Sequence, residues 1–464
     1  NRGQHAFKLP RLPPPMNIII VGAGEIGTHF AQNLAADNHS IVVIESDEEV
    51  AQHLNDQIDA RVVSADGTSI SSLIDAGVAE CDLFLSLTSD NNNNIVSTSV
   101  AKKLGAKKSI ARVHAGVQRD SLFLDFGEHF GIDYIFSSER LAAVELAKHV
   151  RNPESAMVEE IARGYVEIQQ VYVSEKSKLC GQPLSEIEFP ARVRVGAITR
   201  GKETIVPSAD ETLQPGDLAT LAGEPSKLHE TVMRLQARSG KDQKSNIVIF
   251  GGGEYGFSLA QSLESWNCCI RIFEEDVERC QELTDLLANV TILNADATSI
   301  TEMKEELIGD ADFFIAVTDI DEDNVMTCLQ AHSLGTKYCL PLIHRADYAD
   351  AMTGFGEKLG ILAAISPREA TRKDLSRFIT SDRFHLLHKI EGVELIESSV
   401  SKTSSIVGKM VKEVDWPTDC VLVAMLHGAR GEVPAADDII DKEDSLYALV
   451  KPKAKRAFLK LVAP

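Results

Sequence analysis

The chain has 464 residues, of which 44% are hydrophobic and 25% charged, the ordinary balance of a chain that buries a sizeable core. Its formal net charge of −22 argues against binding to nucleic acid or to an anionic lipid surface, because both require a basic face. We expect no direct membrane insertion, since no apolar run approaches the roughly 18 residues of a membrane span. The eight cysteines show no CxxC pair and no zinc spacing, so no metal site is expected.

Residues 1–15 (NRGQHAFKLPRLPPP) match nothing that follows them in the chain. The proline run opposes a helix, and Met16 directly precedes the first apolar run. We expect residues 1–15 to be a tag or a disordered tail, an expression remnant before Met16, with a natural Pro-rich tail as the alternative.

A strand, a glycine turn, a helix and a second strand are predicted within residues 17–47. The turn carries Gly22, Gly24 and Gly27, and Glu45 ends the second strand 21 residues after Gly24. Dinucleotide binding requires these residue types in this order, because the glycines allow a tight turn, close approach of a pyrophosphate and close helix packing. Glu45 is suited to accept hydrogen bonds from ribose hydroxyls, and its charge disfavours the extra phosphate of NADP.

Further strands are expected at residues 60–63, 81–87 and 109–114, alternating with helical stretches that include residues 95–104. This alternation predicts a doubly wound parallel sheet whose strand ends carry the ligand site. Asp66 follows one such strand and is placed to meet the adenine amino group or a ribose.

Thr88, with Asn91 or Asn92, follows the next strand and is placed to meet phosphate or ribose. Arg112 is the one basic residue near a strand end in this half, which makes it a candidate for phosphate pairing. The alternative for these side chains is local capping or turn formation, which Asp, Thr and Asn perform routinely.

Residues 121–150 show two helical patterns that are broken near residues 131–134. Their apolar residues are too many to cover only their own sheet, notably Leu122, Phe123, Leu141 and Leu146. A helical hairpin that clasps a neighbouring subunit or lobe explains this surface, and a core within the domain is the alternative.

After Arg151 a linker leads into a module of short strands that opens at residues 165–173. Turn signals recur about every dozen residues, and a helical tail covers residues 225–235. This pattern predicts a small α+β domain.

The whole arrangement occurs twice in the chain. The second glycine turn holds Gly251, Gly253 and Gly256, followed by Glu274, at an offset of 229 from the first. Thr88 returns as Thr318 and His114 as His344 at an offset of 230. The small module returns at an offset of 227, so the chain is a duplication of the form A-B-A′-B′.

These repeats predict an α/β fold with two Rossmann-like lobes, each followed by a small α+β module. The expected boundaries are a tail at 1–15, a first lobe with helical crossover at 16–150, a first module at 151–238, a linker at 239–245, a second lobe with helical crossover at 246–384, and a second module at 385–464.

This order resembles the RCK domain family, the regulators of potassium conductance, in its tandem form. The resemblance rests on the GAGEIG and GGGEYG turns, the acids Glu45 and Glu274, the ADGTS and NADATS stretches, and the strand that ends Arg112-Val-His114. It covers residues 16 to about 451, and the fourfold order is its specific part.

The resemblance implies regulation without catalysis. Members bind NAD(H), ATP or ADP in the lobes, form homodimers and a homotetrameric ring, and act on a membrane potassium channel subunit, here one resembling TrkH. The expected location is the cytoplasm, peripheral on the inner face of the cell membrane. The small modules pair with one another in this family and can hold a second ligand.

The expected nucleotide-binding residues are Gly22, Gly24, Glu25, Ile26, Gly27, Glu45, Ser46, Asp66, Gly67, Thr88, Ser89, Asn92 and Arg112 in the first lobe, and Gly251, Gly253, Glu254, Tyr255, Gly256, Glu274, Asp296, Ala297 and Thr318 in the second.

Two features depart from a simple phosphate site. Arg112 becomes Leu342 in the second lobe, although Arg345 lies three residues on, so that site is expected to prefer a less charged nucleotide, to bind weakly or to be degenerate. Glu25 and Glu254 also place negative charge inside the glycine turns, which does not suit a phosphate unless the side chains point away.

A soluble NAD-dependent dehydrogenase is the enzyme alternative, and it requires a proton-relay residue over the nicotinamide. His114 and His344 are the repeated histidines, and we interpret both as structural. A nucleotide sensor that acts on a different partner is the third possibility.

Overall fold

The computed structural model describes residues 15–120, 124–153, 155–237, 244–264, 266–345, 348–349, 352, 359–379, 384–390, 392–428 and 430–463. The chain divides into two compact units. One unit comprises Asn1–Arg151 with Gln243–Ile379, and the other comprises Asn152–Asp242 with Thr380–Pro464. Each unit therefore combines segments from both halves of the duplication.

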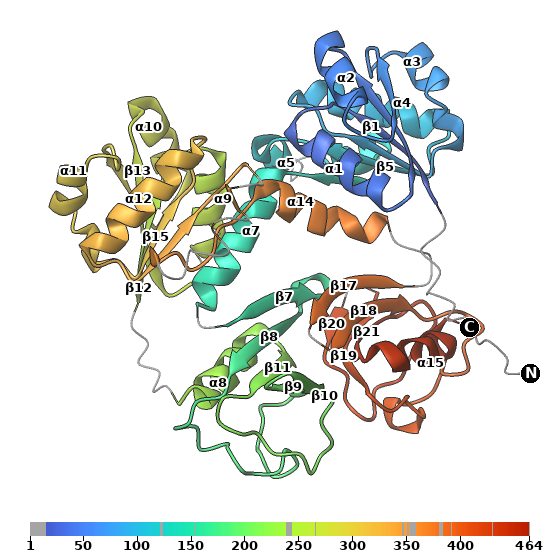
Figure 1. Cartoon of the computed structure of the whole chain (residues 1–464), viewed down its shortest axis with the longest axis vertical. Helices are drawn as coiled ribbons and strands as arrows, with labels where there is room; N and C mark the ends of the chain where they lie inside the picture. The colour runs from blue at the N-terminus through green and yellow to red at the C-terminus, as the bar shows by residue number, and fades with distance from the viewer. Residues whose placement is uncertain are drawn as a thin grey trace, which may run out of the picture. The chain divides into compact units, whose positions relative to one another are not determined.

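The first lobe is a parallel sheet of order β3-β2-β1-β4-β5-β6 with helices on both faces (Figure 1). Its elements are β1 Asn17–Val21, α1 Glu25–Ala36, β2 Ser40–Glu45, α2 Glu48–Asn55, β3 Arg61–Ser64, α3 Ile70–Asp75, β4 Leu83–Ser86, α4 Asn91–Leu104, β5 Lys108–Arg112, α5 Ala115–Asp120, α6 Phe126–Phe130, β6 Tyr134–Phe136 and α7 Ser138–Arg151. The break expected near residues 131–134 leads into β6, a short strand that the sequence analysis missed.

The central strands are apolar on both faces because both faces are covered. In β1, Ile18 and Ile20 belong to one core cluster, whereas Ile19 and Val21 belong to another on the opposite side of the sheet. A parallel sheet buried in this way gives continuous apolar runs in the sequence, which is why the strands were predictable.

The second lobe repeats this architecture, with sheet order β14-β13-β12-β15-β16. Its elements are β12 Ser245–Phe250, α9 Glu254–Leu263, β13 Cys268–Glu274, α10 Val277–Leu286, β14 Val290–Asn294, α11 Ile300–Glu305, β15 Phe313–Ala316, α12 Asp321–Leu334, β16 Tyr338–Pro341 and α14 Pro367–Leu375. The predicted pair of Rossmann-like lobes is confirmed.

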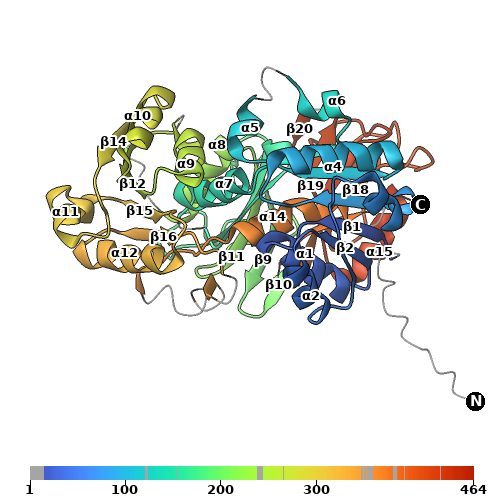
Figure 2. The same cartoon turned by 90° about the horizontal axis from the view of Figure 1, so that it is seen from above.

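The two lobes exchange helices. Helix α7 packs against α9 of the second lobe, and Ala142, Leu146 and Ala147 are buried in that lobe's core (Figure 1). In return, α14 lies beside α1, and its Leu375 is buried in the core of the first lobe (Figure 2). The apolar surface predicted for residues 121–150 is therefore divided. Part of it packs in the neighbouring lobe of the same chain, whereas Leu141 and Phe126 pack in their own lobe. Leu122 and Phe123 lie outside the described residues.

The second unit contains two antiparallel sheets of matching order, β7-β8-β11-β9-β10 and β17-β18-β21-β19-β20. Their elements are β7 Met157–Ile161, β8 Val166–Tyr172, β9 Arg194–Arg200, β10 Glu203–Ile205, β11 Leu218–Gly223 and α8 Pro225–Leu235, then β17 His385–Ile390, β18 Val393–Ser399, β19 Cys420–His427, β20 Arg430–Glu432, β21 Ser445–Val450 and α15 Pro452–Val462. The first module opens at β7, before the expected residue 165. One core cluster draws on both modules, including Ile168 and Leu449, so the modules pair within the chain.

Candidate functional site

The two glycine turns present open backbone at the ends of the central strands. Gly22 has φ of +95°, and a Cβ there would lie 2.9 Å from Thr88 Cγ2, so the turn requires glycine. A Cβ on Gly24 would meet nothing within 4 Å, and Gly253 is equally open. No side chain caps the N-terminus of α1 or α9. These features fit a pyrophosphate, because uncapped N–H groups at a helix N-terminus attract anions.

The acid after each second strand closes its glycine turn. Glu45 accepts hydrogen bonds from the N–H of Ala23 at 2.6 Å and from the N–H of Asp47 at 3.0 Å. Glu274 accepts from the N–H of Gly252 at 2.8 Å and from that of Asp276 at 2.9 Å. The sequence analysis gave these carboxylates a ribose-binding role, and the structure adds that they hold the turn in shape.

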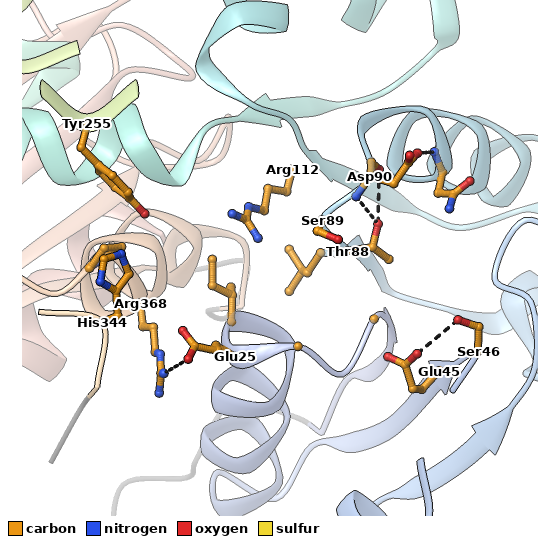
Figure 3. A pocket seen from close by; sticks show the side chains of 16 residues that line it. Glu25, Glu45, Ser46, Thr88, Ser89, Asp90, Arg112, Tyr255, His344 and Arg368 are labelled. Atoms are coloured by element: carbon orange, nitrogen blue, oxygen red, sulfur yellow. Dashed lines mark hydrogen bonds and ion pairs between the residues drawn. The ribbon is translucent and has the colours of Figure 1, made fainter. Parts of the chain in front are cut away.

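A cavity of about 450 Å³ lies over the first turn (Figure 3). It brings together Gly22, Gly24, Glu25, Ile26, Glu45, Ser46, Thr88, Ser89 and Arg112 of the expected first-lobe set. Asp90 and Asn93 line it too, although the sequence analysis did not select them. The Arg112 side chain points into the space between the turn and Tyr255.

The other expected residues of this lobe lie beside or below the cavity. Asp66 and Gly67 line an adjoining cavity of about 50 Å³ that shares Gly22 and Glu45 with the first. Gly27 packs under the turn, where a Cβ would lie 2.0 Å from the Gly22 carbonyl oxygen. Asn92 is exposed and lines neither cavity.

Asp66 and Thr88 also form the local contacts that were the alternative interpretation. The Asp66 carboxylate accepts from the N–H and the hydroxyl of Thr68, both at 2.8 Å, and the backbone bond lowers the Asp66 pKa. The Thr88 hydroxyl donates to Asn94 Oδ1 at 2.7 Å, as Thr318 donates to Asn324 at 2.8 Å. Turn formation and a position at the cavity wall therefore coexist at these residues.

A second cavity, of about 640 Å³, lies over the second turn. It includes Gly251, Gly253, Glu254, Tyr255, Glu274, Asp296 and Thr318 of the expected set. Gly256 packs beneath the turn, where an added Cβ would lie 1.9 Å from the Gly251 carbonyl oxygen. Ala297 is fully buried. Glu275, Asp319 and Asp323 line the cavity in addition.

Each cavity is also lined by residues of the other lobe. His344 and Arg368 of the second lobe reach the first cavity, whereas His114 and Glu139 of the first lobe reach the second. Tyr255 lines both cavities, and its burial raises the pKa of the hydroxyl. The repeated histidines were interpreted as structural, and each makes a local contact, His114 with the Ser89 carbonyl oxygen at 3.2 Å and His344 with the Asp321 carboxylate at 3.0 Å. Each also lies at the wall of the opposite cavity.

The acids within the glycine turns form ion pairs with the other lobe. Glu25 Oε1 lies 2.9 Å from Arg368 Nη2 on α14, a contact drawn in Figure 3. Glu254 Oε2 lies 2.9 Å from Arg119 Nη1 on α5, and its other oxygen lies 3.3 Å from Arg279. This arrangement explains why both turns carry an acid, since each directs its charge sideways to an arginine.

The cation predicted for phosphate pairing has a carboxylate neighbour. Arg112 Nη2 lies 3.5 Å from Glu139 Oε1 on α7, and His114 Nδ1 lies 3.4 Å from the same oxygen. At the matching position of the second lobe, Leu342 is fully buried in the core. Arg345 lies by Glu322 and stacks on Tyr348, and it does not line the second cavity.

The fold and the two cavities define a duplicated chain of the dinucleotide-binding class, with paired antiparallel modules. Among the residues that the structure describes, no cluster of His, Cys, Asp or Glu is arranged to hold a metal ion. None of the helices found there combines the length and apolar character needed to cross a bilayer.

Family models place the chain among known sequences. The TrkA-N domain matches residues 18–138 and 247–367, and the TrkA-C domain matches residues 168–236 and 395–463. The chain is 30% identical over 437 residues to the Trk system potassium uptake protein TrkA homolog of Archaeoglobus fulgidus, covering 94% of this chain and 97% of that one. It is 29% identical to the Trk system potassium uptake protein TrkA of Halomonas elongata, over 95% and 97% of the two chains. The chain belongs to the TrkA family.

Solved structures share the fold at low identity. The GsuK channel bound to NAD is similar over 98% of this chain and 81% of that chain, with a TM-score of 0.59 and 18% identity. The GsuK RCK domain is similar over 100% and 98% of the two chains, with a TM-score of 0.57 and 18% identity. The expected tandem RCK architecture is confirmed at the level of the fold.

Proposed function

We propose that this chain is the nucleotide-binding regulatory subunit of a potassium uptake system. In this proposal NAD(H), ATP or ADP binds at the glycine turns, the chain assembles into a homodimer or homotetrameric ring, and the ring gates a membrane subunit resembling TrkH. The chain would act in the cytoplasm, against the inner face of the membrane. The names of its relatives and the NAD-bound GsuK channel support this role.

The observation that carries the proposal is the reciprocal lining of the two cavities. A ligand in the first cavity would touch the turn of one lobe and also His344 and Arg368 of the other. Because a ligand shifts an equilibrium only through different affinity for two conformations, contacts that depend on how the lobes meet give it that difference. The ligand would therefore favour one arrangement of the lobes over another.

Chain residues would hold the nucleotide as follows. The N–H groups of the glycine turns and the adjoining helix N-termini take the pyrophosphate, with Arg112 as a further partner in the first lobe. Asp66 and Asp296 lie where the adenosine end would bind, and Glu45 and Glu274 face the ribose. The nucleotide supplies charge and shape, and it undergoes no reaction in this scheme.

Calorimetric titration of NADH, NAD⁺, ATP and ADP into the full chain tests the binding step. Asp66→Ala is expected to weaken binding at the first lobe at least about tenfold, and Asp296→Ala to do the same at the second. Unchanged affinities in both variants would refute these site assignments.

Potassium flux tests the regulatory step. Liposomes that hold a Trk-type membrane subunit should show flux that depends on nucleotide when the wild-type chain is added, and not when both Asp variants are combined. Turnover of NADH with hydroxy or keto acids, without any effect on flux, would instead support a dehydrogenase.

A further inference from the structure

The two cavities differ in charge at positions that the duplication aligns. Three neutral residues that line the first cavity become acids in the second: Ser46 corresponds to Glu275, Ser89 to Asp319 and Asn93 to Asp323. Because the surrounding folds match, each cavity serves as a reference for the other. In the opposite sense, Asp90 of the first cavity corresponds to the neutral Ile320 of the second.

The basic residues that line the two cavities also differ. Arg112 and Arg368 line the first cavity, whereas no Lys or Arg is found among the described residues that line the second. Leu342 stands at the position of Arg112. The exchanged helices add to the difference, since α14 brings Arg368 to the first cavity and α7 brings Glu139 to the second.

Ion pairs offset only part of the acidic wall. Glu254 is paired with Arg119 and Arg279, and Glu139 with Arg112. The remaining carboxylates, Glu274, Glu275, Asp296, Asp319 and Asp323, have no Lys or Arg nitrogen within 4 Å in the described part of the chain. Their field therefore opposes a polyphosphate, and salt screens it because Glu275 and Asp319 are exposed.

The backbone of the second turn nevertheless retains its pyrophosphate geometry. Gly253 leaves open space, the α9 N-terminus has no side-chain cap, and Glu274 closes the turn as Glu45 does. A ligand that suits both features has one pyrophosphate and carries a positive charge of its own. The oxidised dinucleotide NAD⁺ has this chemistry, because its pyridinium ring is cationic whereas that of NADH is neutral.

We propose that the second cavity is selective for NAD⁺ and discriminates against ATP, ADP and NADH, whereas the first cavity accepts the more anionic nucleotides. The selectivity rests on the proposed nucleotide-binding function. It arises from the wall formed by Glu275, Asp319 and Asp323 rather than from the turn.

Nucleotide binding to the second cavity is measured alone in the full-length Gly24→Ala variant, in which the added methyl group occupies the phosphate position at the first turn. Calorimetry with NAD⁺, NADH and ATP should there rank NAD⁺ as the tightest ligand, by at least about tenfold over ATP. The triple variant Glu275→Ser, Asp319→Ser and Asp323→Asn, which installs first-lobe residues, should raise ATP affinity at least about tenfold. Added salt should strengthen ATP binding to the parent and have less effect on the triple variant, because screening weakens the repulsion.

The matched control places the second-lobe acids in the first cavity. Ser46→Glu, Ser89→Asp and Asn93→Asp, measured in a Gly253→Ala background, should lower ATP affinity there by a similar factor. Thermal melts of each variant confirm that it is folded. Equal affinity of the second cavity for NAD⁺ and ATP, or no effect of the triple variant, would overturn the selectivity while leaving nucleotide binding intact. A wild-type chain that binds no nucleotide at either cavity would overturn the proposed function as well.

Discussion

The exchange of α7 makes a specific prediction about where a cavity mutation acts. Leu146 is fully buried in the core of the second lobe, together with Ile247, Phe257 and Leu340. Leu146→Ala removes three carbon atoms, which corresponds to about 2.4 kcal/mol of lost transfer free energy at about 0.8 kcal/mol per group. The residual cavity adds about 1–2 kcal/mol, so the free energy of unfolding should fall by about 3.5–4.5 kcal/mol.

Hydrogen exchange followed by mass spectrometry locates this loss. Although Leu146 belongs to the first half of the sequence, the amides of β12 should lose protection before those of β1. Leu375→Ala on α14 should give the reverse pattern, since Leu375 is buried in the first lobe's core. Val144→Ala, at a half-buried position of α7, is the control and should cost less than about 1 kcal/mol. Loss of protection in β1 rather than β12 for Leu146→Ala would refute the reasoning.

Two further predictions concern a turn and a titrating group. Gly27→Ala should lower the melting temperature and abolish nucleotide binding at the first lobe, because its Cβ would lie 2.0 Å from the Gly22 oxygen. Gly24→Ala should melt like the wild type but lose at least about tenfold in affinity, since its methyl enters open space; an equal loss of stability in both would contradict this. His149, on α7, has its pKa lowered from 6.5 by burial, so the unfolded chain binds the proton more readily. The stability it contributes is present above about pH 6.5 and is lost as the pH falls through the lowered pKa, so melts between about pH 7.5 and 5.5 should show a flatter profile for His149→Gln. The charges of Glu145, Lys148 and Lys373 also act on this ring, and an unchanged slope for His149→Gln would refute the contribution of His149 to the pH dependence.

Much of the fold was predictable because its signals are local. The apolar run of β1, the glycine turn and the acid Glu45 lie within 30 residues, and their order has few interpretations. The duplication strengthened these assignments, since the glycine turn and the acid that closes it appeared twice. β6 was missed because a three-residue strand is too short to show a periodicity.

The candidate site was only partly predictable, because its walls come from distant parts of the chain. Glu254 meets Arg119 at a separation of 135 residues, and nothing local to the turn indicates that contact. Asn92 was chosen from the sequence, but Asn93 is the residue that lines the cavity, for a different reason. Asp90 caps α4 by accepting from the N–H of Asn93, and this sets which residue of the first turn faces the cavity.

The exchanged helices also constrain how the polypeptide is made. Helix α7 is synthesised roughly a hundred residues before β12 begins, and the strands it must join continue to about residue 340. At a translation rate of about 5–20 residues per second, its apolar face stays unpaired on the order of ten seconds before the strands that bury it are synthesised. Neither lobe can finish folding until α14 has left the ribosome. A nascent chain that stalls before that point would expose apolar surface and need chaperone protection.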